Sequence, residues 1–200
     1  MPLHLRRLAV IFLVLLALIP IAAAAVSPQG ADEFAQKLAL IQRQADSSER
    51  AGMRHTRLTQ DELNSWFMYR AQPLLPNGVG EPQVTIVGDG RLAGRAVVDL
   101  DAVAKRHSTG GTFDPLSLIG GKVPVSVTGI LYTRDGLARF EVRTAEMSGI
   151  PVPVTVLQEL VIYYSRTPER PQGVRLDDTF ALPANILQIE VGQGQAVVVQ

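Results

Sequence analysis

The chain has 200 residues, of which 46% are hydrophobic, and its 19 basic residues are balanced by 19 acidic ones. This balance gives no electrostatic basis for binding nucleic acid, or for binding anionic lipid through a polybasic surface. The absence of cysteine excludes disulfides and an anchor on an N-terminal Cys, so a hydrophobic core must supply the stability.

The first 25 residues have the pattern of a secretory signal peptide. Two arginines precede an unbroken apolar run over residues 8–19, and Pro20 and an alanine run over residues 22–25 follow it. Pro20 disfavours a continuing helix at the place where a peptidase must reach extended chain. We therefore predict cleavage after the last alanine.

An uncleaved membrane anchor is the alternative interpretation of this segment. The apolar stretch over residues 8–26 is close to the roughly 20 apolar residues that cross a bilayer. Both interpretations predict export, with residues 26–200 forming a single domain in the periplasm or on the extracellular side of the cytoplasmic membrane. Contact with the membrane is then expected only through the N-terminal segment, where that segment is retained.

Residues 27–50 predict an amphipathic helix. Phe34, Leu38 and Ile41 recur at three- and four-residue steps, and Ser27, which precedes a proline, supplies an N-cap. We expect this helix to pack on its own domain, because a helix that lies on a membrane usually carries a denser basic face.

A second helix is predicted over residues 59–74. Thr59 and Glu62 have the spacing of a capping box, in which each side chain bonds the backbone amide of the other residue. The apolar side of this helix is formed by Leu63, Trp66 and Phe67. We expect it to lie against a sheet, with both aromatic side chains buried.

Three hairpins are predicted in the rest of the chain. The first turns at residues 88–90 and the second at 134–136, where glycine accepts a positive φ without steric cost. Strict alternation of apolar residues over 92–100 indicates one buried and one wet face. The third hairpin is expected to run from Val174 through Leu182, break at Pro183, and turn at residues 192–194.

A third helix is predicted over residues 155–165, with Thr155 as its N-cap. Its broad apolar face includes Leu157, Leu160 and Val161. The whole pattern predicts an α+β fold, in which a curved, mostly antiparallel sheet of long hairpins is wrapped around or packed against two to three helices.

The sequence contains no recognisable catalytic or metal-binding pattern. His55 and His107 have basic neighbours, and without cysteine they leave a zinc site short of ligands. There is no G-x-S-x-G elbow, and the dinucleotide-like match at residues 88–93 leads into a strand instead of the required helix. We therefore expect no enzyme activity, catalytic residue, metal or cofactor.

Three short motifs occur in a familiar order: L-T-x-x-E-L-N at residues 58–64, G-x-P-x-P at 149–153, and F-x-L-P-x-x-I at 180–186. With glycine-turned hairpins between them, the chain resembles the bacterial envelope relatives of the tubular lipid-binding superfamily over most of residues 50–200. The resemblance implies a strongly curved antiparallel sheet around a helix, with an apolar groove for acyl chains.

Two functions follow as hypotheses. The first is binding of a lipid or another apolar small molecule in a groove between the sheet and the helices at 59–74 and 155–165. The second is a non-enzymatic structural or assembly component of the cell envelope, with a filled core and a protein partner. The predicted lining comprises apolar residues on inner faces: Leu63, Trp66, Phe67, Leu92, Val98, Val125, Val127, Leu157, Leu160 and Val161. The alternative for each of them is that it only fills the core.

Overall fold

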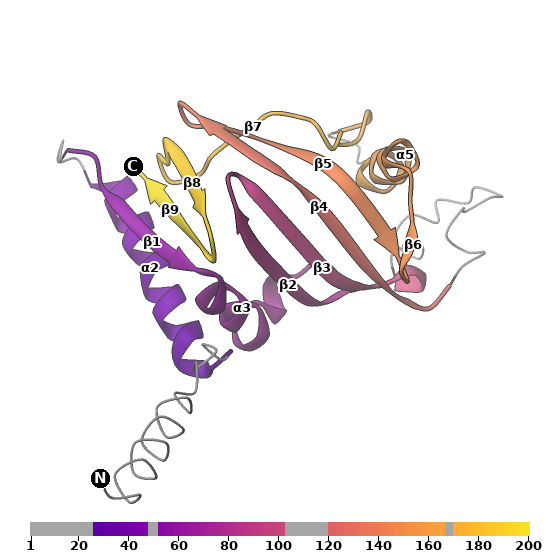
Figure 1. Ribbon diagram of the computed structural model, residues 1–200, viewed down its shortest axis with the longest axis horizontal. Helices are drawn as coiled ribbons and strands as arrows, with labels where there is room; N and C mark the ends of the chain where they lie inside the picture. Colours follow the sequence, from indigo (N-terminus) through magenta and orange to yellow (C-terminus); the bar gives the residue numbers. More distant parts are fainter. Residues whose placement is uncertain (1–25, 48–51, 103–119, 167–169) are drawn as a thin grey trace, which may run out of the picture.

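The computed structural model describes residues 26–47, 52–102, 120–166 and 170–200. The predicted leader over residues 1–25 lies outside the described residues, and so does His107. Two antiparallel sheets and their helices form an α+β fold, which confirms the predicted fold class (Figure 1).

The large sheet has the strand order β2-β3-β4-β5-β6, and β7 also pairs with β5. Its strands are β2 (Val79–Gly88), β3 (Arg91–Asp99), β4 (Lys122–Arg134), β5 (Leu137–Met147), β6 (Ile150–Pro151) and β7 (Phe180–Ala181). The small sheet has the order β1-β9-β8, with β1 (His55–Thr59), β8 (Gln188–Gly192) and β9 (Gln195–Val199). The helices are α2 (Pro28–Asp46), α3 (Gln60–Tyr69), the short 3₁₀ helix η1 (Gln72–Leu74) and α5 (Val154–Ser165).

The predicted caps form at the start of the first two helices. The Ser27 hydroxyl accepts the Gly30 amide of α2 at 3.1 Å. The capping box of α3 is complete, because the Thr59 hydroxyl accepts the Glu62 amide and the Glu62 carboxylate accepts the Thr59 amide. These contacts fix the first turns of both helices, as their sequences predict.

The prediction of Thr155 as an N-cap is wrong. The residue that precedes α5 is Pro153, which has extended backbone and makes no side-chain cap, so Thr155 lies inside the helix. The proline ring already holds the φ of Pro153 at −55°, and the helix begins directly after it.

The first two hairpins turn where the sequence predicts. Asp89 and Gly90 both have positive φ, and so do Asp135 and Gly136, which is the conformation of a tight type I′ turn. The turn between β8 and β9 also forms at the predicted place. The other part of the third predicted hairpin is wrong, since most of the segment 174–182 is not strand.

Side chains bond the backbone amides of that segment and keep it out of a ladder. The Leu176 amide is bonded by Gln158 of α5, and the Val174 amide by Ser165. The β8–β9 hairpin does not extend the large sheet as expected, because β9 pairs with β1, a strand absent from the sequence-based prediction.

The molecule has a different kind of packing at each end of the large sheet. Figure 1 shows α2, α3 and the small sheet at one end, and α5 at the other. A core of Ile41, Ile186 and Val198 joins α2 to the small sheet. At the other end, Leu100 and Val123 form a second core that includes Leu160 of α5.

Candidate ligand-binding face

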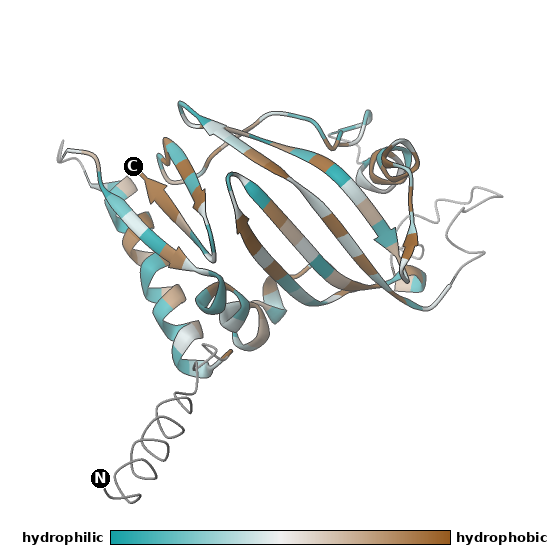
Figure 2. Cartoon of the chain, in the orientation of Figure 1, coloured by the Kyte–Doolittle hydropathy of each residue, from teal (hydrophilic) through white to brown (hydrophobic). Residues whose placement is uncertain are grey.

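One face of the large sheet is lined by apolar side chains. Val84, Gly94, Val127 and Ala145 lie directly opposite one another across β2, β3, β4 and β5. Residues that are opposite across strands share a face, as do alternate residues along each strand. The neighbouring rows on this face are Ile86, Leu92, Gly129 and Val142 on one side, and Ala96, Val125 and Met147 on the other. We call these three rows the apolar face; they contribute to the brown bands along the strands in Figure 2.

The reverse face of the same sheet is polar and wet. Arg91, Arg95 and Thr128 are exposed on it. Glu141 bonds Arg143 at 3.0 Å, and the Thr128 hydroxyl bonds that of Thr144 at 2.6 Å. The sheet therefore separates a charged surface from an apolar one, as the alternation over 92–100 predicts.

Other elements cover the two ends of the apolar face. At one end, Leu160 of α5 belongs to the cluster that contains Val125 and Met147. At the other end β8 approaches β4, where the Thr133 hydroxyl accepts the Ile189 amide and donates to the Ile189 carbonyl oxygen, at 3.0 and 2.9 Å. A hollow of about 720 Å³ lies beside this contact, and Leu131, Ala138, Ile189 and Val191 are among its lining residues.

The middle of the apolar face is open. Among the residues that the structure describes, and apart from its two chain neighbours, a Cβ atom placed on Gly94 would meet no atom within 4 Å. Leu92, Ala96 and Val127 around it stay partly exposed. Gly129 on the same face differs, since a Cβ there would lie 2.5 Å from the Phe140 ring. The unfilled space above the sheet is therefore limited to Gly94 and its neighbours. It lies between the end of the apolar face that α5 covers and the end that β8 covers.

Five of the ten predicted lining residues come together at this face. Leu92, Val125 and Val127 belong to its rows, while Val98 lies at its end and packs in the same cluster as Leu160. Leu157 and Val161 lie on α5 with partly exposed side chains. These residues are consistent with one continuous surface from α5 to the centre of the sheet.

The three predicted residues on α3 lie elsewhere. This helix packs against α2 and the outer edge of β2. The Trp66 ring lies 5.6 Å from the rings of both Phe34 and Phe67, measured between centroids. Trp66 and Phe67 are half-buried, not fully buried as expected, and Leu63 is also half-buried. Phe67 instead lines a separate hollow of about 490 Å³ between α3 and β2.

Two polar side chains hold α3 to the edge of β2. The Asn64 amide group both accepts from the Val84 amide and donates to the Val84 carbonyl oxygen, each at 2.8 Å. Gln60 accepts the Ile86 amide at 2.8 Å, and the Gly194 amide bonds the Ile86 carbonyl oxygen. The sequence prediction did not include this role for Gln60 and Asn64, although their four-residue spacing sets them on one side of the helix.

A partly buried ion pair links α2 to the start of α3. Lys37 bonds both carboxylate oxygens of Glu62, at 2.6 and 2.8 Å. Burial raises the pKa of Glu62, but the bonds from Lys37 and from the Thr59 amide together outweigh it and hold the pKa below its ordinary value of 4.5. This carboxylate has a structural role and lies outside the apolar face.

Across residues 26–47, 52–102, 120–166 and 170–200, no three His, Cys, Asp or Glu side chains are grouped as a metal site would require. Within the same ranges, no helix has the length and hydrophobicity needed to cross a bilayer.

The fold and this face define an α+β protein with a partly uncovered antiparallel sheet. No family model, no curated protein and no solved structure matches the chain. The functional argument therefore depends on the residues of the apolar face themselves.

Proposed function

We propose that this chain is an exported cell-envelope protein that binds an acyl chain or another apolar ligand on the apolar face, between α5 and β8. The observation that supports the proposal is the open room above Gly94, in the middle of an apolar row that crosses four strands. Covering apolar surface is worth about 25 cal/mol per Å². An uncovered apolar surface is typical of a binding site.

The dimensions of the face suit a hydrocarbon chain. The uncovered stretch of β4 lies between Val125 and Gly129, which are four residues apart and, at about 3.4 Å per residue, roughly 14 Å from each other. The hydrocarbon core of a bilayer is roughly 30 Å thick, so one leaflet contributes chains of about half that length. An acyl chain from one leaflet therefore fits along β4.

The chemistry of the face indicates where a polar head group would lie. The three rows of the apolar face contain no charged residue, so a buried charge there would have no partner. We therefore expect the hydrocarbon part of the ligand on the face and the polar part in solvent. The helix α3 is left outside the proposed lining, because it contacts the edge of β2.

The direct test fills the open room. Gly94→Phe adds a large side chain where a Cβ meets nothing, so the variant is expected to fold and to block the face. Thr128→Phe is the matched control, since Thr128 is exposed on the reverse face of the adjacent strand. The full chain, recovered from the envelope fraction, would be titrated with pyrene-labelled hexadecanoic acid and analysed by native mass spectrometry.

We expect the wild type and Thr128→Phe to bind the probe and to carry co-purified lipid, and Gly94→Phe to bind at least tenfold more weakly. No binding by the wild type, together with a destabilised Gly94→Phe, would contradict the proposal. That result would favour the second function, a structural or assembly component of the envelope whose sheet packs on a protein partner.

A further inference from the structure

The hollow of about 490 Å³ between α3 and β2 lies at the outer edge of the large sheet. The two hydrogen bonds between Asn64 and Val84, each 2.8 Å long, join the helix to the strand at this place. Small-molecule sites usually have volumes of about 300–1,000 Å³. The hollow is therefore large enough for a small ligand, and the function proposed above does not use it.

The lining of this hollow combines apolar surface with negative charge. Phe67 and Met68 of α3 and Pro82 of β2 supply apolar surface, while Asp61 and Glu81 supply one carboxylate each. None of the described lining residues is basic, so the two carboxylates give the lining a formal charge of −2. A cation with an apolar body matches this combination.

Neither carboxylate forms an ion pair within the described part of the chain. The basic side chains of α2 and α3 bond other acids, since Lys37 pairs with Glu62 and Arg70 with Asp32. Arg95 of the neighbouring strand β3 is not among the residues that line the hollow. Two like charges that share a small volume attract a cation from outside.

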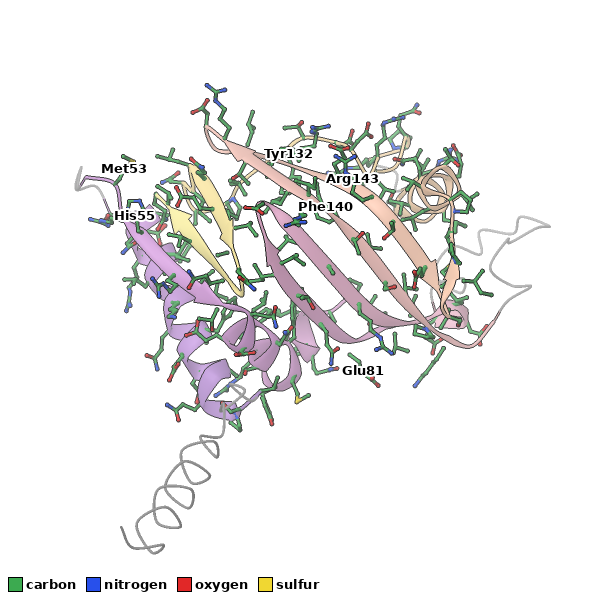
Figure 3. The ribbon with its side chains drawn as sticks, in the orientation of Figure 1. Met53, His55, Glu81, Tyr132, Phe140 and Arg143 are labelled. Atoms are coloured by element: carbon green, nitrogen blue, oxygen red, sulfur yellow. The ribbon has the colours of Figure 1, made fainter. Side chains whose placement is uncertain are left out.

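The backbone at Glu81 departs from the regular strand. Its φ is +49°, in the left-handed region that residues other than glycine seldom adopt. The register of β2 against β3 shifts between Gly80 and Gln83, on either side of this residue. A bulge of this kind redirects a side chain. The carboxylate of Glu81, which Figure 3 labels, is thereby placed among the groups that line the hollow.

We propose that this hollow binds a small primary alkylammonium ion, with its ammonium group toward Asp61 and Glu81 and its alkyl part against Phe67 and Met68. An ammonium group has three donors, and carboxylates accept charge-assisted hydrogen bonds from it. A calcium ion matches the lining less well, because two carboxylates fall short of the six to eight oxygen ligands that calcium takes. This site does not depend on the acyl-chain site.

The test uses methionine methyl groups, which report on the two sites separately. Met68 lines the hollow, whereas Met147 belongs to the apolar face. The full chain, labelled with ¹³C-methyl methionine and recovered from the envelope fraction, would be titrated by NMR with n-butylammonium. A parallel titration uses 1-butanol, which has the same number of heavy atoms and no charge. The Met68 signal is assigned from Met68→Leu.

We expect the Met68 signal to shift saturably with n-butylammonium, with a Kd at least fivefold below that of 1-butanol. The Met147 signal should stay unchanged over the same range. Pyrene-labelled hexadecanoic acid should instead shift Met147, so each proposal can fail without the other. If Met68 does not respond to n-butylammonium, or if 1-butanol binds equally well, the hollow is not a site for this ion.

A pair of double variants separates a local charge from the net charge. Asp61→Asn with Glu81→Gln removes both lining carboxylates and should weaken binding of n-butylammonium at least fivefold. Glu33→Gln with Asp89→Asn removes the same amount of charge from exposed side chains outside the lining, and should bind like the wild type. An equal loss in both double variants would contradict the proposal. The wild-type titrations are decisive even where a variant does not fold.

A lysine side chain of another protein would present the same ammonium group. Nα-acetyl-lysine N-methylamide therefore serves as a third probe of the wild type. It should bind more weakly than n-butylammonium, because its peptide groups add bulk that the hollow does not need. Tighter binding of this probe would assign the hollow to a protein partner and overturn the small-ligand proposal.

Discussion

The contact between α2 and α3 and the apolar face of the large sheet each contain a glycine, and the two glycines have opposite surroundings. A Cβ on Gly30 of α2 would lie 2.8 Å from the hydroxyl of Ser65, which is itself buried on α3. A Cβ on Gly94 would have no atom of another described residue within 4 Å, its chain neighbours aside. The first glycine permits two helices to approach closely, and the second leaves room above a sheet. Packing is therefore complete where α2 meets α3 and incomplete over the centre of the sheet.

Removal of the Trp66 side chain, in the well-packed region, is expected to lower the free energy of unfolding by the largest amount. Trp66→Ala deletes the ring between Phe34 and Phe67 and should lower the free energy of unfolding by about 3 kcal/mol, the low end for a large aromatic because the side chain is half-buried. Tyr69→Ala, at the exposed end of the same helix, is the control and should change stability by less than about 0.5 kcal/mol. Equal losses in urea denaturation would show that α3 is not packed through its aromatic side.

Neutralisation of Glu62 should lower the free energy of unfolding by an intermediate amount, and this amount should depend on pH. Its pKa lies below 4.5 in the folded protein, so the ionised carboxylate stabilises the fold above that pH, and the contribution is lost as the pH falls through the folded pKa. Glu62→Gln keeps the capping geometry and should cost about 1–2 kcal/mol near neutral pH. Urea denaturation near neutral pH and at a pH below the folded pKa of Glu62 should show this difference present in the first case and lost in the second. Glu33→Gln, on the exposed side of α2, should behave like the wild type at both pH values.

The smallest change in the free energy of unfolding is expected for a substitution on the apolar face. Gly94→Val adds a β-branched side chain to a strand at a point without neighbours, so stability should stay unchanged or rise by up to about 1 kcal/mol. A thermal melt of this variant beside Gly30→Val separates the two regions, because the latter should lose about 1–3 kcal/mol through overpacking. A clear loss for Gly94→Val would mean that the face is already filled.

Local chemistry made several elements predictable from the sequence. The capping box at Thr59 and the Asp-Gly turns at residues 89–90 and 135–136 depend on neighbours within a few residues. The alternation over 92–100 likewise gave the two faces of the sheet, and with them Leu92 and Val98 of the candidate site. These features need no knowledge of distant partners.

Contacts between segments that are far apart in the sequence could not be predicted from local residues in this way. The strand β1 pairs with β9 across about two thirds of the chain, and nothing within its five residues indicates that partner. The position of α3 depends on Asn64 bonding the backbone of Val84, which no apolar periodicity reveals. For this reason the predicted groove combined Trp66 and Phe67 with sheet residues that lie in a different part of the molecule.

Hydrogen bonds from Gln60, Asn64 and Gly194 occupy part of the outer edge of β2, and they limit how far the large sheet can extend. The backbone groups of Val84 and Ile86 that face outward are already bonded, so no strand can be added at this edge. The opposite edge, at β5, is paired by β7 at Leu137 and Ala138 and by β6 at Glu146 and Met147. A full-length strand from a second molecule therefore meets bonded backbone at both outer edges of the large sheet, which opposes growth into a fibre.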